Sequence, residues 1–360
     1  MKLVIVINDP VVGLGLLRAA CFNGYETDVV ARTGCAWLAW TKACGRFSEI
    51  DESLIENDLT TVLQDLGYDD SRYFCLAAGE IATKALAEAA HVIRAQTLPT
   101  IFSEEALLLG NKAGFADICQ NLEIPIPMTW HVTKKEEILQ LTTHNNFSFP
   151  VIIKAVNMSG SIGIKMAASA DEVEALVADS TFNFSPLVVQ EYIKGEDICL
   201  SFFAQEGGID LAYGQKVSKF GASFPAYDEF FEHAKLISKS IGYTGAANLD
   251  ARVDDQGRLY LIECNTRFWA SSFLSCLLDI DLIAEAKKFT SDSKPAERYY
   301  SDNQQFTLKN ACLGLMSLGP LSREKSLRFF RLASMDIRGF LLTKLPITRR
   351  AVEQLVISRG

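Results

Sequence analysis

Short apolar runs alternate with amphipathic segments along the first hundred residues. Their periods predict one helix, Gly13–Phe22, and four strands, at Leu3–Ile7, Thr27–Ala31, Tyr73–Ala77 and Val92–Ile93. Because strands and helices alternate, we expect a small doubly wound α/β domain that ends at about residue 100.

Farther along the chain, strands come in pairs that are separated by turn residues. Val151–Lys154 is apolar up to its lysine, and the Ser/Gly-rich segment Asn157–Gly163 separates it from an apolar stretch that ends at Ala168. We expect a hairpin whose loop can approach a phosphate closely, because Gly160 has no side chain, while the lysine supplies a cation. The alternative is an ordinary flexible hairpin whose lysine reaches solvent.

A second predicted hairpin carries three polar side chains on one face. Two alternating runs, AANLDARV and RLYLIECN, flank the acidic and Gly-containing turn Asp254–Gly257. The simplest register places Asp250 opposite Leu261, so Asp250 shares a face with Glu263 and Asn265, and the two carboxylates are diagonal neighbours roughly 7–8 Å apart. Two carboxylates and an amide oxygen are hard ligands that suit Mg²⁺, whereas the alternative is a solvated face of an edge hairpin.

The strand Leu187–Ile193 lies between these two hairpins and runs into Lys194–Asp197. Such a segment can cross a nucleotide base, with Glu191 and backbone groups bonding the amino edge and a later acid holding the ribose hydroxyls.

Two features near the start of the chain have ordinary explanations. Gly13 and Gly15 form a Gly-x-Gly pair, but Arg18 stands where a dinucleotide fingerprint needs its third glycine. Asn8 and Asp9 interrupt the first apolar run after a few residues, which favours a buried strand over a signal peptide.

Composition is that of a globular enzyme. The 360 residues include 49% hydrophobic ones and carry a net charge of −9, which disfavours binding to nucleic acid through bulk electrostatics. Nine cysteines without a Cys-x-x-Cys pair indicate reduced thiols and a cytoplasmic location. The sequence has no apolar run of the roughly 18–20 residues that a transmembrane helix needs.

The last sixty residues differ in charge from the rest. Ten basic and four acidic residues give segment 302–360 a net charge of +6, against −15 for the preceding residues. Two basic amphipathic helices are predicted here, SREKSLRFFRLASMDIRGFLL and ITRRAVEQLVI. We expect them to pack on the acidic body, with an anionic membrane surface or a carrier protein as the alternative partner.

Five of these motifs, in this order, resemble the ATP-grasp superfamily, which includes D-alanine–D-alanine ligase, biotin carboxylase and the large subunit of carbamoyl phosphate synthetase. The motifs are Asn111-Lys112 before a helix, LEIPIP, FPVIIK with its Ser/Gly loop, VQEYIKGED, and an Asp-x12-Glu-x-Asn-x-Arg pattern. The resemblance covers roughly residues 103–286. It implies an ATP-grasp fold with an N-terminal α/β domain (1–100), a body (101–295) divided at about residue 190 into a hairpin-lid part (from about 112) and a metal-binding part, and a basic helical C-terminal extension (296–360).

The resemblance also implies a role for each matching residue. Phosphate contacts are implied for Lys112, Lys154, the lid residues Ser159, Gly160, Ser161 and Gly163, and Lys216, for which Lys219 competes. Adenine contacts are implied for Gln190, Glu191 and the backbone of Ile193, and ribose contacts for Glu196 or Asp197, with strand parity favouring Asp197. Magnesium ligands, with Mn²⁺ as a substitute metal, are implied at Asp250, Glu263 and Asn265, and Arg267 resembles the arginine that steadies the transferred phosphate. Tyr192 stands where many relatives have lysine.

The chemistry implied is ATP-dependent ligation of a small-molecule carboxylate, activated as an acyl-phosphate, to an amine. The alternatives are an enzyme that activates bicarbonate, like biotin carboxylase or carbamoyl phosphate synthetase, and a module that senses ATP without turnover. A homodimer is common among such relatives.

Overall fold

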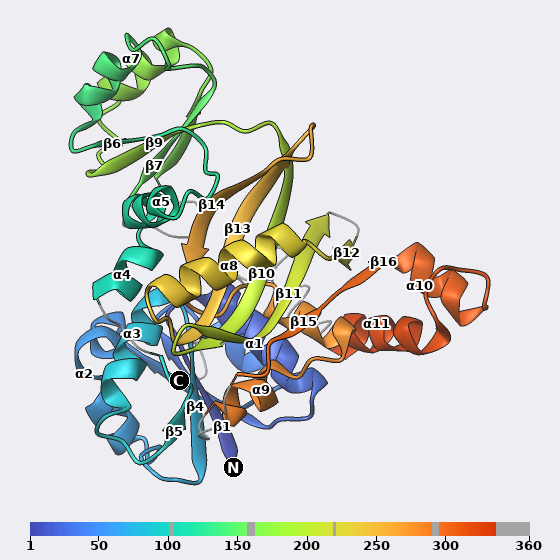
Figure 1. Cartoon of the computed structure of the whole chain (residues 1–360). Coiled ribbons are helices and arrows are strands. Elements are labelled where there is room, and N and C mark those ends of the chain that lie inside the picture. Colours follow the sequence, from blue (N-terminus) through green and yellow to red (C-terminus); the bar gives the residue numbers. More distant parts are fainter. Residues whose placement is uncertain (101–103, 157–162, 219–220, 290–294, 336–360) are drawn as a thin grey trace.

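The computed structural model describes residues 1–100, 104–156, 163–218, 221–289 and 295–335. Three sheets organise these residues (Figure 1). Three of the five motifs, FPVIIK, VQEYIKGED and the Asp-x12-Glu-x-Asn-x-Arg pattern, lie mainly on the second and third sheets, and the first sheet forms the part of the molecule that contains the N-terminus.

The first sheet is parallel, has the strand order β3-β2-β1-β4-β5, and is covered on both faces by helices. Alternate residues of β1 enter different cores: Ile5 packs with α1, whereas Val4 packs with α2 and α3. This confirms the expected doubly wound arrangement. The elements are β1 (Lys2–Ile7), α1 (Pro10–Phe22), β2 (Thr27–Arg32), η1 (Ala36–Trp40), β3 (Cys44–Ile50), α2 (Glu52–Asp65), β4 (Tyr73–Ala78), α3 (Glu80–Ala89) and β5 (Gln96–Thr97).

Two sequence predictions in this region need correction. Helix α1 begins at Pro10 rather than Gly13, because the Asp9 side chain accepts hydrogen bonds from the first turn and proline needs no donor there. The strand predicted at Val92–Ile93 was wrong: the N–H groups of both residues bond to Ala89 in the turn after α3. Ile93 is apolar because it packs in the core, and the last strand of the sheet starts at Gln96.

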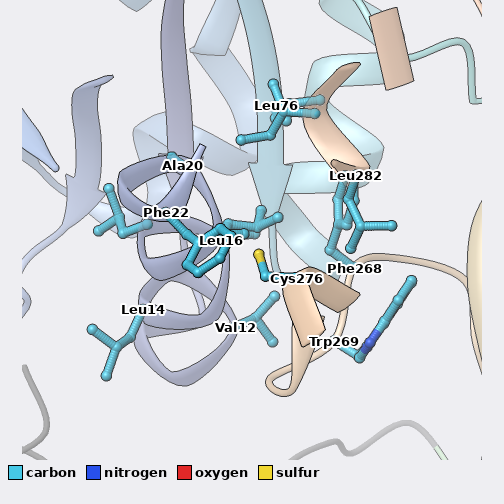
Figure 2. Close-up of a cluster of buried hydrophobic side chains, with 14 of the residues drawn as sticks. Val12, Leu14, Leu16, Ala20, Phe22, Leu76, Phe268, Trp269, Cys276 and Leu282 are labelled. Atoms are coloured by element: carbon cyan, nitrogen blue, oxygen red, sulfur yellow. The ribbon is translucent and has the colours of Figure 1, made fainter. Parts of the chain in front are cut away.

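The pair Gly13 and Gly15 serves helix packing. A Cβ atom at Gly15 would lie 2.4 Å from the carbonyl oxygen of Ala270, and one at Gly13 would lie 2.6 Å from the Ile7 side chain. The segment after strand β14 (Leu259–Asn265) therefore approaches α1 closely. Figure 2 shows the result, a core in which Val12 and Leu16 of α1 lie beside Phe268 and Cys276.

The second sheet is antiparallel, has the order β6-β9-β7-β8, and encloses its own small core with α6 and α7. Figure 1 shows it as a lobe on the far side of α4 and α5 from the first sheet. The predicted hairpin around the Ser/Gly loop is confirmed by the pairing of β7 with β8. The elements are α4 (Glu104–Gly110), α5 (Lys112–Asn121), β6 (Thr129–Val132), η2 (Lys135–Glu137), α6 (Ile138–Leu141), β7 (Val151–Ala155), β8 (Ile164–Ala167), α7 (Ala170–Ala178) and β9 (Leu187–Glu191).

The third sheet has the order β14-β13-β10-β11-β12-β16, with β15 paired to β11. Helix α8 packs on one face through the core that contains Phe230 and Ile237. The elements are β10 (Gly195–Gln205), β11 (Gly208–Ser218), β12 (Gly221–Phe224), α8 (Asp228–Ser240), β13 (Gly245–Asp254), β14 (Leu259–Asn265), η3 (Ser272–Leu278), α9 (Leu282–Lys288), β15 (Arg298–Tyr300), β16 (Asp302–Thr307), α10 (Leu308–Leu315) and α11 (Arg323–Met335).

The sequence had suggested an entirely helical C-terminal extension. The structure shows that this extension also contains strands. Residues 298–307 supply β15 and β16, because Phe306 pairs with Ala222 and joins the main core instead of lying on an amphipathic helix. Helix α11 packs on the body as expected: Arg331 donates to the Phe22 carbonyl at 2.8 Å, and Arg328 lies 3.1 Å from Asp279. The second predicted tail helix lies outside the described residues.

All nine cysteines are described and are free thiols. Burial raises the pKa of several of them, including Cys75 to about 12. No helix in the described part of the chain is long and apolar enough to cross a membrane.

Candidate functional site

A cavity of about 550 Å³ is lined by strands of both antiparallel sheets. Its volume lies in the range of small-molecule sites. Seven residues whose side chains or backbone we assigned to ATP or metal line it: Lys154, Gln190, Glu191, Ile193, Asp197, Asp250 and Glu263.

Asp250 and Glu263 lie directly opposite each other on β13 and β14. The register predicted from the sequence was wrong, because the turn closes between Asp254 and Arg258 around a three-residue loop in which Gly257 has a φ of 80°. A β-bulge between Asp250 and Ala251 then shifts the pairing again. The two carboxylates are therefore direct cross-strand neighbours rather than diagonal ones, and they share a face as expected.

Two amide side chains hold the Asp250 carboxylate. Asn248 donates to one oxygen at 2.9 Å and Asn265 donates to the other at 3.1 Å. Ser201 in turn donates to Asn248, and Arg267 donates to the Asn265 amide oxygen at 3.0 Å. This chain of hydrogen bonds fixes the direction of each group that faces the cavity. Asn248 had not been singled out in the sequence, although its spacing of two from Asp250 placed it on the same face.

Two lysines bring positive charge to the same place. The Lys112 ammonium at the start of α5 lies 3.9 Å from a Glu263 oxygen, and Lys154 is close enough to affect the pKa of Asp250.

Burial raises the pKa of Asp250 to about 7, and the negative charge of Glu263 adds to this effect, while Arg267 and Lys154 oppose it. Burial also lowers the pKa of Lys154, against the attraction of Glu263. Both shifts are typical of a site that is organised for a charged ligand.

Lys154 and Gln190 form a buried pair beneath the cavity. The Lys154 ammonium, only 6% exposed as a residue, donates to the Gln190 amide oxygen at 2.8 Å, and the Gln190 amide nitrogen donates to Thr129. Gln190 thus orients the lysine directly, and its own side chain is engaged within the protein.

The segment after β9 is fixed by a cation from the other sheet. Arg252 donates to the Ile193 carbonyl at 2.6 Å and to the Asp197 carboxylate at 2.6 Å, and its guanidinium lies 4.8 Å from the centre of the Tyr192 ring. Positive charge from β13 is therefore present beside Tyr192. Asp197 lines the cavity and its side chain remains largely exposed, so its carboxylate can accept hydrogen bonds from hydroxyl groups.

Glu196 and Lys216 are placed elsewhere. Gln215 and Asp250 both pair with Cys199, so their side chains share a face, and the next residue, Lys216, points to the opposite face. There its ammonium lies 2.6 Å from Glu196. The structure does not bring these two residues into the cavity lining.

Gln215 occupies the position that Lys216 was expected to fill. It lines the cavity and is completely buried, and neither polar atom of its side chain has a hydrogen-bond partner among the described residues. A buried amide in this state costs free energy unless a ligand satisfies it. The sequence contained only one indication of this role. Gln215 faces the same side of the sheet as Cys199 once the two strands pair as a hairpin.

Of the four residues predicted to form a lid, only Gly163 is among the described residues. Ser159, Gly160, Ser161 and the competing Lys219 lie outside the described residues. Gly163 has a φ of 70°, where a side chain is unfavourable, and a Cβ atom there would lie 2.8 Å from Ala155. Glycine is therefore required where the loop rejoins β8.

Arg267 lies at the junction with the first sheet. It does not line the large cavity but borders a small one of about 20 Å³, together with Ala77, Thr83 and Ala246. Its guanidinium donates to Asn265 and to the Phe268 carbonyl.

The donor set fits a hard divalent cation. Two opposed carboxylates and an adjacent amide oxygen are all oxygen ligands, and a cation would offset both the burial of Asp250 and the negative charge of Glu263, which together raise the pKa of Asp250. Within the described part of the chain, no group of three or more His, Cys, Asp or Glu side chains is clustered suitably for a metal.

Comparisons with known proteins agree with this geometry. Residues 106–200 match the model of the RimK-like ATP-grasp domain. D-aspartate ligase of Enterococcus faecium is 23% identical over 78% of this chain and 74% of its own length, and D-alanine–D-alanine ligase of Trichlorobacter lovleyi is 25% identical over 33% and 44%. The chain thus spans less than half of the latter relative.

A solved structure extends the likeness to the fold. The biotin carboxylase domain of Hydrogenobacter thermophilus 2-oxoglutarate carboxylase, a dimer in complex with MgADP, ADP and bicarbonate, superimposes with a TM-score of 0.60 at 17% identity, over 84% of this chain and 71% of that one. The expected ATP-grasp fold is confirmed.

Proposed function

We propose that this ATP-grasp protein is an ADP-forming ligase that activates a carboxylate as an acyl-phosphate and couples it to an amine. The observation that carries the proposal is the cross-strand pair Asp250 and Glu263, which faces a nucleotide-sized cavity together with the buried Lys154. The similarity to D-aspartate ligase and D-alanine–D-alanine ligase supports this choice within the fold.

The cavity offers a consistent place for each part of ATP. Glu191 and the backbone at Ile193 would contact the adenine, and Asp197 the ribose, since all three residues line the cavity. Lys154 and Lys112 would contact the phosphates, the first from beneath and the second beside Glu263. Asp250, Glu263 and the Asn265 oxygen would hold Mg²⁺, with Mn²⁺ as a substitute, and the metal would neutralise charge on the terminal phosphates.

The reaction would proceed in two displacements. A carboxylate oxygen attacks the γ-phosphorus, the bond to the β-phosphate oxygen breaks, and ADP leaves with the electron pair. The amine nitrogen then attacks the activated carbonyl carbon, loses a proton, and expels phosphate as the C–O bond breaks. Arg267, held by Asn265 and Phe268, would stabilise negative charge that develops on the transferred group.

An ADP-release screen over amino acids, small carboxylates and bicarbonate tests this function. We expect release to require a carboxylate with an amine, and hydroxylamine to trap a hydroxamate of the carboxylate only when ATP is present. Release with bicarbonate alone, giving carboxylated or carbamate products, would instead identify a bicarbonate-activating enzyme. ATP binding without release under any condition would indicate a sensing module.

A further inference from the structure

A short linker joins the two sheets that line the cavity of about 550 Å³, which is called the nucleotide cavity from this point. Residues 192–194 connect β9, in the second sheet, to β10, in the third, and Figure 1 shows the second sheet as a separate lobe. Two linker residues, Tyr192 and Ile193, line the cavity. The groups that hold the linker therefore determine where these two residues lie relative to a bound nucleotide.

One side chain of the third sheet makes three contacts around this linker. Arg252 of β13 donates from Nη1 to the Ile193 carbonyl at 2.6 Å and from Nε to the Asp197 carboxylate at 2.6 Å, and its guanidinium lies 4.8 Å from the centre of the Tyr192 ring. A guanidinium has its donors in a rigid planar fork, so it can hold a carbonyl and a carboxylate in fixed directions at the same time.

The backbone holds the other end of the linker against the same strand. Gly195 begins β10, and a Cβ atom there would lie 2.0 Å from the carbonyl oxygen of Val253, the residue after Arg252. The chain therefore enters β10 in direct contact with β13. Because Arg252 binds Ile193 two residues earlier, both ends of this short segment are positioned by adjacent residues of β13.

The ion pair between Arg252 and Asp197 is suited to orienting groups rather than to stabilising the fold. The Arg252 side chain is 20% exposed and the Asp197 side chain is 81% exposed, so water screens the pair and its contribution to folding is small. The hydrogen bond from Nε to one carboxylate oxygen nevertheless restricts rotation of the Asp197 side chain, and this fixes the direction of the second oxygen.

We propose that Arg252 is a positioning residue for the nucleoside part of ATP, an inference that rests on the placement of ATP given under the proposed function. Arg252 holds the Ile193 backbone where it meets the adenine, and it holds the Asp197 carboxylate where it accepts hydrogen bonds from the ribose hydroxyls. Without Arg252 both groups are still present, but they must be ordered when ATP binds, which lowers the affinity. The phosphates and the metal are bound by other residues, so their contacts are not affected.

Calorimetric titration in the presence of Mg²⁺ tests this role by comparing ATP with tripolyphosphate, which has the phosphates and lacks the nucleoside. Arg252→Met keeps an unbranched stem and removes all three contacts, so ATP affinity should fall about ten-fold while tripolyphosphate affinity changes by no more than about two-fold. Arg252→Lys keeps the charge without the planar fork and should recover only part of the ATP affinity. The lysine variant thus separates positioning from the loss of a positive charge.

Two further variants provide matched controls. Arg258 is an exposed arginine in the turn of the same hairpin, where it pairs with Asp254, and Arg258→Met should leave both affinities unchanged. Lys154→Met removes a proposed phosphate contact and should weaken ATP and tripolyphosphate alike. If Arg252→Met weakens both ligands equally, or weakens neither, Arg252 does not position the nucleoside.

These titrations contain neither a carboxylate nor an amine substrate, so their result is independent of the reaction. If the natural protein binds ATP and Arg252→Met does not change its preference for ATP over tripolyphosphate, the positioning role fails and the nucleotide site stands. If the natural protein binds neither ligand, the placement of ATP fails and the positioning role fails with it. A selective loss of ATP affinity in a protein that releases no ADP with any substrate would support the positioning role and contradict the ligase proposal. Where ADP is released, Arg252→Met should raise the KM for ATP about ten-fold and leave kcat within a few-fold.

Discussion

The nucleotide cavity and a second cavity, whose lining is mostly apolar, are similar in volume, about 550 and 570 Å³, but they are built in different ways. The nucleotide cavity takes most of its charged groups from paired strands, where Asp250 and Glu263 are thirteen positions apart in the sequence and adjacent in space. The apolar cavity brings Leu14 of α1 against Leu332 of α11, more than three hundred positions apart. The carboxylate pair of the first cavity can be predicted from spacing in the sequence. The lining of the second cavity is known only from the folded structure.

The comparison separates two kinds of energetics. In the nucleotide cavity, charges that repel or are desolvated in the free protein become favourable when a charged ligand arrives. In the apolar cavity, affinity should follow the apolar area that a ligand buries. Variants of the first should therefore change metal binding and turnover.

The largest effect is expected for the metal pair. Glu263→Gln and Asp250→Asn should each lower Mg²⁺-dependent turnover on the order of 10²–10³-fold, because each removes an anionic ligand. The free variants should stay folded, since they relieve like-charge repulsion. Steady-state kinetics against Mg²⁺ and Mn²⁺ measures the effect, and full activity in either variant would remove that residue from the ligand set.

The same pair predicts a dependence on pH. The pKa of Asp250, about 7 in the folded protein, lies above its unfolded value, so this group contributes stability below about pH 4 that is lost as pH rises through 7. Asp250→Asn should therefore be increasingly more stable than the natural protein between pH 4 and 8, as followed by thermal unfolding. Since the ligand is the carboxylate, Mn²⁺ affinity of the natural protein should increase over pH 6–8 and then level off. An affinity that is constant over this range would contradict the raised pKa.

Arg267 should show the next largest effect, on the rate. Arg267→Ala should lose about 10²-fold in turnover while ATP affinity stays within a few-fold, because the guanidinium acts on charge that develops during transfer. An arginine that only packs between Asn265 and Phe268 would lower stability and leave the rate per folded molecule nearly normal. Kinetics and nucleotide titration on the folded variant distinguish the two roles.

Lys154 should affect nucleotide binding rather than the rate alone. Lys154→Met keeps most of the buried stem and removes the charge, so ATP affinity should fall about ten-fold. Lys165, an exposed lysine on the neighbouring strand β8, provides the control, and Lys165→Met should bind ATP normally. Calorimetry that finds equal affinity in both variants would contradict the phosphate contact.

Particular residues show how much of the site and of the fold could be predicted from the sequence. It placed Asp250, Glu263 and Asn265 on one face, because the one-residue shift at the turn and the one-residue shift at the bulge add up to two and leave the facing of Asp250 unchanged. It missed their direct pairing, because a bulge has no composition signal that a single sequence reveals. It also could not place Phe306 in a strand, since only the edge of β12 makes a strand favourable there.

The smallest predicted effect concerns the residue that the sequence did not reveal. Gln215 and Gln190 both line the cavity proposed for ATP and are both buried, but among the described residues only Gln190 has hydrogen-bond partners, Lys154 and Thr129. Gln215→Leu should therefore stabilise the free protein by about 1 kcal/mol, because it removes a buried amide that has no partner among the described residues, while Gln190→Leu should destabilise it. If Gln215 contacts ATP, Gln215→Leu should also weaken ATP binding a few-fold, and the stabilisation by ATP in thermal unfolding should shrink accordingly. If the variant is more stable and binds ATP normally, Gln215 destabilises the fold and does not contact ATP. If the variant is less stable, the Gln215 amide forms hydrogen bonds within the protein.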